Sequence, residues 1–205
     1  MYLYIAFIIS YLLGSFPTAV IVGKLFYKTD VRSYGSKNPG ATNTLRVLGK
    51  KAAIIVLILD ILKGFIATKL ALWMPVNLYD INIADAQLLC GLFAILGHIF
   101  PVFLKFKGGK GIATCFGVAL SLYFTVSVIT LVSFIVIVSL TRYVSLGSII
   151  AVIIFSTLSI SLGREQTSLE IIFFIAISFT VLFTHRKNIM KLLRCQENKI
   201  NFKKK

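Results

Sequence analysis

The chain has 205 residues, 58% of them hydrophobic, and carries 22 Lys and Arg against 7 Asp and Glu for a net charge of +15. Soluble domains average about 45–50% apolar residues, so this composition argues against a soluble protein. Long apolar runs with few charges predict an all-α, polytopic integral membrane protein, because a β-barrel would show short alternating segments. The positive charge lies in loops that flank the runs, which favours membrane orientation and contact with anionic lipid or phosphate over nucleic-acid binding.

Six apolar runs follow one another along the chain, and most have the length that a bilayer core of about 30 Å requires. The first run has no basic flank and no small-residue cleavage site, so it is predicted to be a retained span and not a signal peptide. The fourth run is long for one tilted span and short for two. The runs cover residues 3–22, 52–73, 84–104, 112–140, 146–162 and 169–183.

Most Lys and Arg residues lie in three segments, residues 24–51, 105–110 and 186–205. The positive-inside rule places all three in the cytoplasm. An even number of crossings must then separate the second segment from the third, which predicts that the fourth run is two short helices with a turn near Tyr123–Ser127. We expect about seven spans with the N-terminus outside and the C-terminus inside; five spans with one re-entrant run is the alternative.

The whole chain, 1–205, is predicted to form a single membrane-embedded domain, since it shows no repeat and no soluble domain. The only free polar stretch would be the tail after about Asn188, in which residues 190–205 form the basic cytoplasmic tail.

The most informative loop joins the first two long runs and reads Tyr34-Gly35-Ser36-Lys37-Asn38-Pro39-Gly40-Ala41-Thr42-Asn43-Thr44-Leu45-Arg46, without one acid. Gly35 and Gly40 permit close approach of the backbone to a ligand, and Asn38-Pro39-Gly40 predicts a turn. Its hydroxyl, amide and guanidinium groups suit phosphate oxygens, and a helix starting near Ala41 would point its N-terminus at an anion. The alternative is a solvated connecting loop with ordinary turn residues.

A second loop, Phe106-Lys107-Gly108-Gly109-Lys110-Gly111, repeats this theme on the same predicted face. It lacks the Walker A spacing, and its alternative interpretation is a cytoplasmic charge anchor. His98, near the preceding span end, is predicted to be an interfacial or packed ring.

A third polar group, Thr184-His185-Arg186-Lys187-Asn188-Ile189, follows the last span. His185 suits a base, a donor to phosphate or an interfacial ring, and the alternative is a membrane-edge anchor followed by an amphipathic helix. Within the second run, Asp60 and Lys63 share one helix face, as either a functional pair or a structural ion pair.

Several familiar catalytic motifs are absent from the sequence. Neither His98 nor His185 is followed by an Asp five positions later, no Asp-rich Mg²⁺ motif of the D-x-x-D-G type occurs, and no Cys and His set has zinc spacing. We therefore expect a mechanism without metal or cofactor that depends on positioning and fixed positive charge.

These motifs, in this order, resemble those of the bacterial acyl-phosphate:glycerol-3-phosphate acyltransferases, the PlsY family. The resemblance runs from about Gly14 to Ile200. It implies seven helices and a cytoplasmic active site in the bacterial inner membrane. It further implies transfer of a fatty acyl group from acyl phosphate to the sn-1 hydroxyl of glycerol 3-phosphate, giving lysophosphatidic acid and phosphate. The matching segments are Ser36 to Asn43, Gly97 to Phe103, Lys107 to Thr114, His185 to Ile189, Asp60 to Gly64 and Gln196 to Ile200.

The matching motifs also imply roles for individual residues of this chain. The resemblance implies catalytic roles for Ser36, Arg46, His185 and Asn188. The family usually has glycine at the position of Lys37 and an acid or amide at that of Lys187, so these two lysines depart from it. Substrate or phosphate binding is implied for Asn38, Gly40, Thr42, Asn43, Lys107, Gly108, Gly109, Lys110 and Ser145.

The expected partners are acyl phosphate and glycerol 3-phosphate as substrates and membrane lipids as surroundings, with no nucleic acid, and a monomer is expected. Direct attack of the substrate hydroxyl on the acyl carbonyl is the favoured mechanism, since no neighbour marks Ser36 as an activated nucleophile. A membrane transporter of a phosphorylated solute and a non-catalytic lipid-binding subunit are the alternatives, although the repeats typical of transporters are not visible.

Overall fold

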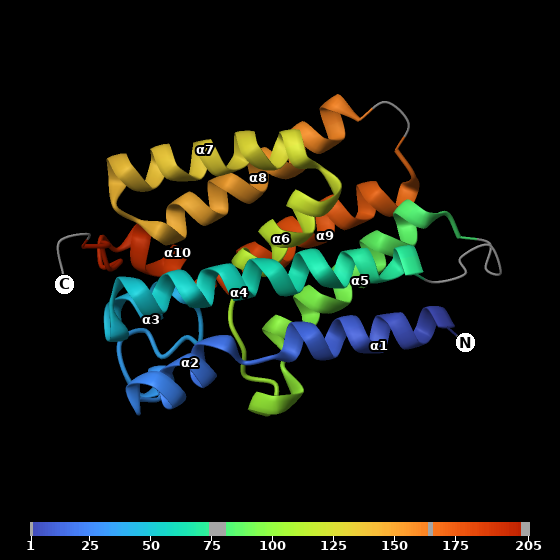
Figure 1. Cartoon of the computed structure of the whole chain (residues 1–205). Coiled ribbons are helices and arrows are strands. Elements are labelled where there is room, and N and C mark those ends of the chain that lie inside the picture. The colour runs from blue at the N-terminus through green and yellow to red at the C-terminus, as the bar shows by residue number, and fades with distance from the viewer. Residues whose placement is uncertain (1, 74–80, 164–165, 202–205) are drawn as a thin grey trace. The chain divides into compact units, whose positions relative to one another are not determined.

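The computed structural model describes residues 2–73, 81–163 and 166–201, and within these ranges every regular element is a helix (Figure 1). The prediction of an all-α protein is confirmed. The chain divides into two compact units that meet in sequence between Leu122 and Tyr123. The first unit holds α1 (Tyr2–Ser15), α2 (Thr18–Tyr27), α3 (Ala41–Leu48), α4 (Lys50–Lys69), α5 (Ile83–Ile99) and α6 (Ile112–Leu122), with the short 3₁₀ helices η1 (Val31–Ser33), η2 (Leu70–Trp73) and η4 (Val102–Leu104).

The long helix α4 is the centre of the first unit, where it packs against α6, α3, α5 and α1, while α1 lies along α5 (Figure 1). Glycines bring α4 and α6 close together. A Cβ atom at Gly64 would collide with the Thr114 carbonyl, and one at Gly117 would collide with the Ile61 carbonyl. Small residues of this kind let helix backbones approach each other inside membranes, where no hydrophobic effect drives association.

The first apolar run is broken in the structure. It was predicted as one span over residues 3–22, but α1 ends at Ser15 and α2 begins at Thr18, with a bend of 42° between them. Pro17 at the break lacks a backbone N–H and cannot continue the helical ladder, which accounts for the difference. At the bend the Phe16 carbonyl accepts a hydrogen bond from Lys63 Nζ at 3.3 Å.

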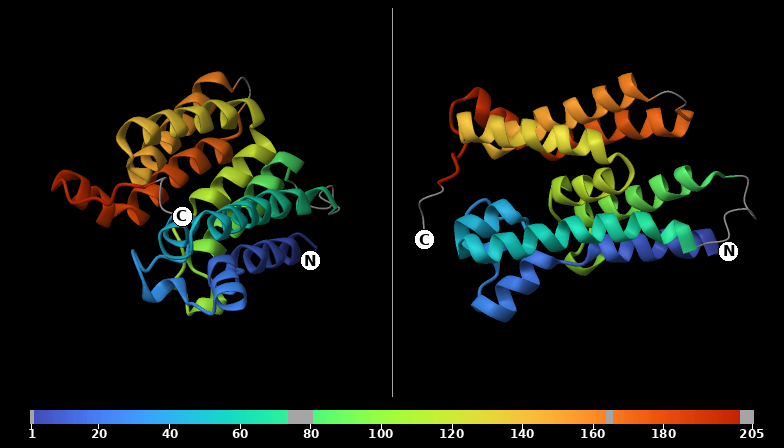
Figure 2. Two further views of the ribbon diagram at one scale, coloured as in Figure 1. Left: turned by 60° about the vertical axis from the view of Figure 1, so that its left-hand side comes forward. Right: turned by 45° about the horizontal axis from the view of Figure 1, so that its top comes forward.

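The fourth apolar run is divided at Tyr123, as the charge argument predicted. Its two helices are α6 and α7 (Phe124–Thr141), although α7 at 18 residues is not short. In the second unit α7 packs on α8 (Val144–Leu162) and α8 packs on α9 (Ser168–Thr184), which continues at a 60° bend into α10 (Arg186–Leu193) (Figure 2). Edge-to-face aromatic contacts fill the space between α8 and α9, with Phe155, Phe173 and Phe174 buried.

The tail differs from the prediction of a free stretch, at least as far as the structure describes it. Ile200 is buried, and its N–H donates to the carbonyl of Arg142 at 2.8 Å. Lys199 lies over the ring of Tyr143 at 5.4 Å. Residues up to Ile200 therefore pack on the connection between α7 and α8. The prediction considered only the charge of this segment and overlooked the isoleucine, which buries its apolar side chain.

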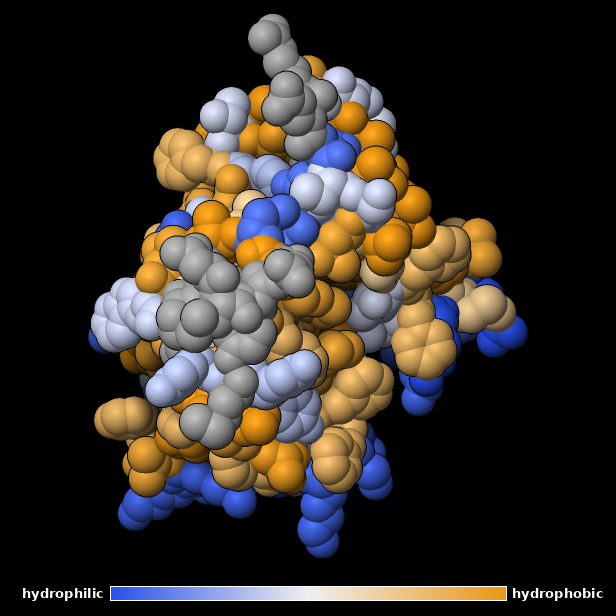
Figure 3. Space-filling view, turned by 90° about the vertical axis from the view of Figure 1, so that its right-hand side faces the viewer, coloured by the Kyte–Doolittle hydropathy of each residue, from blue (hydrophilic) through white to orange (hydrophobic). Residues whose placement is uncertain are grey.

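Three described segments are long and apolar enough to cross a membrane, namely Ile83–Leu104, Phe124–Thr141 and Val144–Leu162. Five qualify if α1 with α2 and α9 with α10 each count as one bent span. Helix α4 is long enough but carries more charges, and its outward residues, such as Ile54 and Ile58, are nevertheless large and exposed. Hydrophobic side chains also predominate on the face drawn in Figure 3. The predicted count of seven spans and the orientation of the termini stay predictions.

Candidate functional site

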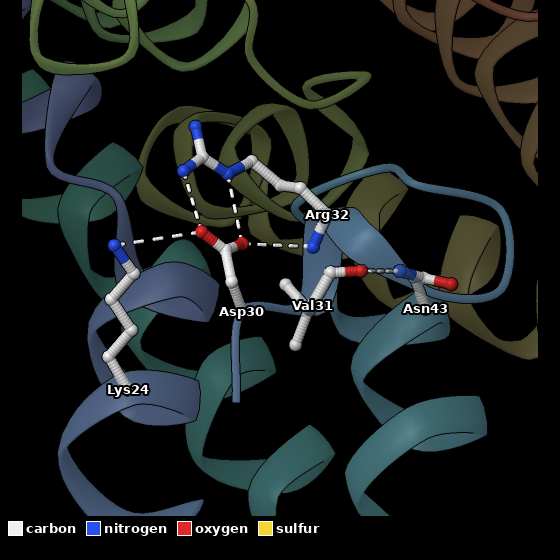
Figure 4. A network of polar contacts seen from close by, with 5 residues as sticks. All are labelled: Lys24, Asp30, Val31, Arg32 and Asn43. Atoms are coloured by element: carbon white, nitrogen blue, oxygen red, sulfur yellow. Dashed lines mark hydrogen bonds and ion pairs between the residues drawn. The ribbon is translucent and has the colours of Figure 1, made fainter. Parts of the chain in front are cut away.

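The entrance to the first loop is anchored by Asp30 (Figure 4). Its carboxylate accepts hydrogen bonds from the backbone N–H and Nε of Arg32, both at 3.0 Å, and from Arg32 Nη2 at 2.6 Å, and it lies 3.6 Å from Lys24 Nζ. The hydrogen bonds from Arg32 lower the pKa of Asp30 to about 2. The carboxylate is therefore charged at neutral pH and holds the start of the loop.

Asn43 holds the first loop together from inside. Its Oδ1 accepts from the backbone N–H of Ser36 at 2.8 Å, and its Nδ2 donates to the carbonyls of Val31 at 2.8 Å and Tyr34 at 3.2 Å (the bond to Val31 is drawn in Figure 4). The side chain is buried, in contrast to the exposed Ser36. Gly35 has φ +60°, and a Cβ atom there would collide with Asn43 Oδ1. Both donors of the Asn43 amide therefore serve the loop backbone.

The remaining first-loop residues lie nearer the surface. Helix α3 begins at Ala41, where it was expected, with Gly40 as its N-cap. Thr42 and Arg46 are four residues apart on one partly exposed face of α3, and Asn38 is also partly exposed. Lys37 has φ +60°, a left-handed conformation that favours glycine. The departure at Lys37 therefore places a strained lysine at the turn.

The second loop folds back on the end of α5. Gly108 N–H donates to the Ile99 carbonyl and Gly109 N–H donates to the His98 carbonyl, each at 3.1 Å. Gly109 is buried against the His98 ring, and a Cβ atom there would overlap Nε2. Lys107 is exposed and Lys110 is partly exposed, so the lysines flank a glycine pair that is fixed to α5.

The first and second loops both border one small cavity in the first unit, which is partly open to solvent. The first loop contributes Pro39, and the second loop contributes Gly108 and Gly109. Lys63 and His98 are the ionisable side chains that line it. The full lining is Gly14, Ser15, Phe16, Pro17, Thr18, Pro39, Lys63, His98, Pro101, Leu104, Gly108 and Gly109.

A buried ionic cluster adjoins this cavity. Asp60 Oδ1 accepts a hydrogen bond from Thr18 Oγ1 at 2.7 Å, and it lies 2.8 Å from Lys63 Nζ and 3.6 Å from His98 Nδ1. Asp60 is 1% exposed, Lys63 8% and His98 7%. The sequence placed Asp60 and Lys63 on one helix face but gave no signal that His98 joins them. Among the described residues no three His, Cys, Asp or Glu side chains gather as a metal site would require.

The third group of predicted residues lies in the second unit and is organised by Glu197. Its Oε1 accepts from Ser145 Oγ at 3.1 Å and from Asn188 Nδ2 at 2.8 Å. His185 is buried, and its Nδ1 lies 2.9 Å from the Val181 carbonyl. Because a carbonyl only accepts, Nδ1 carries the hydrogen, and the lone pair of the neutral ring is on Nε2.

Comparison with known proteins decides the family. A family model described as glycerol-3-phosphate acyltransferase matches residues 4–195. The chain belongs to the glycerol-3-phosphate acyltransferase family. Glycerol-3-phosphate acyltransferases of Staphylococcus aureus are similar over 210 aligned residues, 41% identical in strain bovine RF122 / ET3-1 and 40% in strain JH9. Each alignment covers 98% of this chain and 100% of the relative.

Two solved structures of PlsY (YgiH), an integral membrane glycerol 3-phosphate acyltransferase, resemble the chain at 36% identity. The glycerol 3-phosphate form has a TM-score of 0.87 and covers 97% of this chain and 96% of its own. The lysophosphatidic acid form has a TM-score of 0.84 and covers 97% and 95%. The resemblance found in the sequence is confirmed, and the chain is a multi-pass bacterial membrane acyltransferase.

The predicted residues form two groups, one in each unit. The first-unit loops meet at one cavity, while Ser145 and Asn188 meet at Glu197. The site predictions omitted Glu197, Asp30 and His98. The family-like ending at 196–200 was the only signal that could have indicated Glu197.

Proposed function

We propose that this glycerol-3-phosphate acyltransferase takes its acyl group from acyl phosphate. The acyl group passes to the sn-1 hydroxyl of glycerol 3-phosphate, and the products are lysophosphatidic acid and inorganic phosphate. The observation that supports this most strongly is that two basic, glycine-containing loops border one cavity, through Pro39 of the first loop and Gly108 and Gly109 of the second. Both substrates carry phosphate, and such loops suit phosphate oxygens through backbone N–H groups, hydroxyls and cations.

The proposed reaction is a direct transfer. The sn-1 hydroxyl oxygen forms a bond to the acyl carbonyl carbon, the bond from that carbon to the phosphate oxygen breaks, and the hydroxyl proton passes to a phosphate oxygen or to His185. Phosphate is a good leaving group, so the protein must mainly align the reactants and neutralise their charge. Direct transfer is proposed over an acyl-enzyme because no neighbour in the sequence marks Ser36 as an activated nucleophile.

The predicted residues are proposed to have different tasks. Ser36, Asn38, Thr42 and Arg46 are proposed to contact substrate phosphate from the first loop, together with Lys107 and Lys110 from the second. Gly40, Gly108 and Gly109 give the backbone its shape. Asn43 is proposed to stabilise the first loop from within, since its amide already bonds to three backbone groups.

Ser145, His185 and Asn188 are proposed to act in the same reaction on the strength of the third motif. The Glu197 carboxylate orients Ser145 and Asn188, and the Val181 carbonyl sets the tautomer of His185. Seven spans, an external N-terminus and a cytoplasmic active site are proposed from the charge distribution, because the basic loops and tail would then share the cytoplasmic face.

Kinetics of loop variants test the proposed binding role. Arg46→Ala and Lys110→Ala are each expected to raise the KM for glycerol 3-phosphate or acyl phosphate about tenfold or more, since a charge-assisted hydrogen bond contributes about 1.5–3 kcal/mol. Lys28→Ala is the matched control, because Lys28 is an exposed lysine outside both loops. An unchanged KM for both substrates in both loop variants would contradict the assignment.

A further inference from the structure

The ionic cluster of Asp60, Lys63 and His98 contains a third ionisable side chain, which a stabilising ion pair does not need. Two ionisable side chains approach one carboxylate oxygen, at 2.8 and 3.6 Å, and all three residues are buried. Ionisable groups inside a membrane bundle are costly, and they mark functional positions by default. The pair of Asp60 and Lys63 alone would join α4 to the α1–α2 break through the Phe16 carbonyl. The approach of His98 to the same oxygen therefore needs a separate explanation.

His98 connects the cluster to the second loop by two routes. Its Nδ1 edge faces Asp60, while its Nε2 edge abuts the backbone of Gly109 so closely that no side chain would fit there. Its carbonyl accepts the Gly109 N–H at 3.1 Å, and the next carbonyl along, that of Ile99, accepts the Gly108 N–H. The ring and backbone of one residue thus fix the centre of the loop.

The position of this glycine pair determines where the neighbouring lysines can reach. Lys107 and Lys110 immediately flank Gly108 and Gly109, so a shift of the pair moves both cationic side chains. Gly109 is buried and has no side chain of its own to hold its place. The flat edge of the imidazole supplies that support, provided that the ring does not rotate.

We propose that Asp60 is a positioning residue that acts through His98 to hold the second loop in the conformation that binds phosphate. Asp60 fixes the Nδ1 edge of the ring, and the fixed ring supports Gly109. Thr18 and Lys63 hold the carboxylate in place. The inference rests on the proposed phosphate-binding role of the loop and adds a route by which a buried helix residue controls substrate affinity.

The decisive variant is His98→Asn, which retains a polar group near Asp60 but removes the ring edge at Gly109. We expect the KM for a phosphate substrate to rise about tenfold while kcat changes less than about twofold, because loop geometry and not chemistry is altered. Amide hydrogen exchange at Gly108 and Gly109 is expected to become faster in the absence of substrate. The matched control is Thr68→Val, which removes a buried hydrogen bond within α4, to the Gly64 carbonyl at 2.9 Å, at a residue outside the cavity lining.

Thr68→Val is expected to lower the thermal unfolding temperature and leave both KM values and loop exchange unchanged. Since Asp60→Asn leaves Lys63 buried without its carboxylate and can prevent folding, Asp60→Asn combined with Lys63→Met is the second test. This double variant is expected to show the KM and exchange changes of His98→Asn. Wild-type KM and exchange in folded His98→Asn, or equal changes in Thr68→Val, would overturn the proposal.

Lys110→Ala separates this inference from the proposed function. A raised KM in Lys110→Ala together with an unchanged KM in His98→Asn would overturn only the positioning role. An unchanged KM in Lys110→Ala would remove the phosphate-binding role of that lysine, and amide exchange at Gly108 and Gly109 would still decide whether His98 holds the loop.

Discussion

Replacement of Asn43 by alanine tests whether this side chain holds the first loop or contacts substrate. Asn43→Ala removes three hydrogen bonds, from Ser36 N–H and to the carbonyls of Val31 and Tyr34. Each contributes about 0.5–1.5 kcal/mol net, so the sum has an upper limit of about 4.5 kcal/mol. Ser36 and Tyr34 are exposed, and water can replace their bonds. A loss of about 2 kcal/mol in loop stability is therefore expected, equivalent to a change of about 30-fold in its opening equilibrium.

Two measurements on the Asn43→Ala protein distinguish the roles. Amide exchange over residues 34–44 of the substrate-free protein is expected to accelerate by about 30-fold, because opening governs exchange. The KM for substrate is expected to rise by no more than the factor by which the fraction of protein with a closed first loop falls. A higher KM with unchanged exchange would refute the reasoning and show that Asn43 contacts substrate directly. Asn82→Ala, which removes a helix cap far along the sequence at α5, serves as the control.

Three further predictions concern individual residues. Lys37→Gly is expected to raise the thermal unfolding temperature slightly, because relief of a left-handed lysine, about 1–2 kcal/mol, exceeds the entropic cost of glycine, about 0.5–1 kcal/mol. Because the pKa of Asp30 is lowered in the folded protein, its contribution to stability is present above its unfolded pKa of about 4 and is lost as pH falls through about 2. This contribution amounts to about 1–2 kcal/mol. Unfolding free energies measured at decreasing pH are expected to show this loss in the wild-type protein and not in Asp30→Asn. Glu197→Ala is expected to lower activity about tenfold or more by releasing Ser145 and Asn188, whereas Glu197→Gln, which keeps an acceptor oxygen, retains most activity in the same assay.

Membrane architecture could be predicted from the sequence because hydrophobicity and charge act locally along the chain. The division of the fourth run at Tyr123 followed from charge parity, and the start of α3 at Ala41 followed from turn chemistry. The break before Thr18 was overlooked because the hydrophobic run continues through Pro17 without interruption.

Side-chain roles were harder to predict because they depend on contacts between distant parts of the chain. Asn43 and Arg46 appear equally suited to phosphate in the sequence, but packing of α3 turns one inward and leaves the other partly exposed. The partners of Asp60 include a residue three positions away, which helix geometry predicts, and His98, which only the packing of α4 and α5 brings near. Glu197 lies in a segment whose basic composition predicted a free tail.

The most direct test of the central claim is the stoichiometry of the purified protein in detergent or lipid mesophase, supplied with glycerol 3-phosphate and either palmitoyl phosphate or palmitoyl-CoA. The account predicts one inorganic phosphate released for each 1-acylglycerol 3-phosphate formed from palmitoyl phosphate, and no product from palmitoyl-CoA. Product from palmitoyl-CoA, or glycerol 3-phosphate binding without product from either donor, would contradict it.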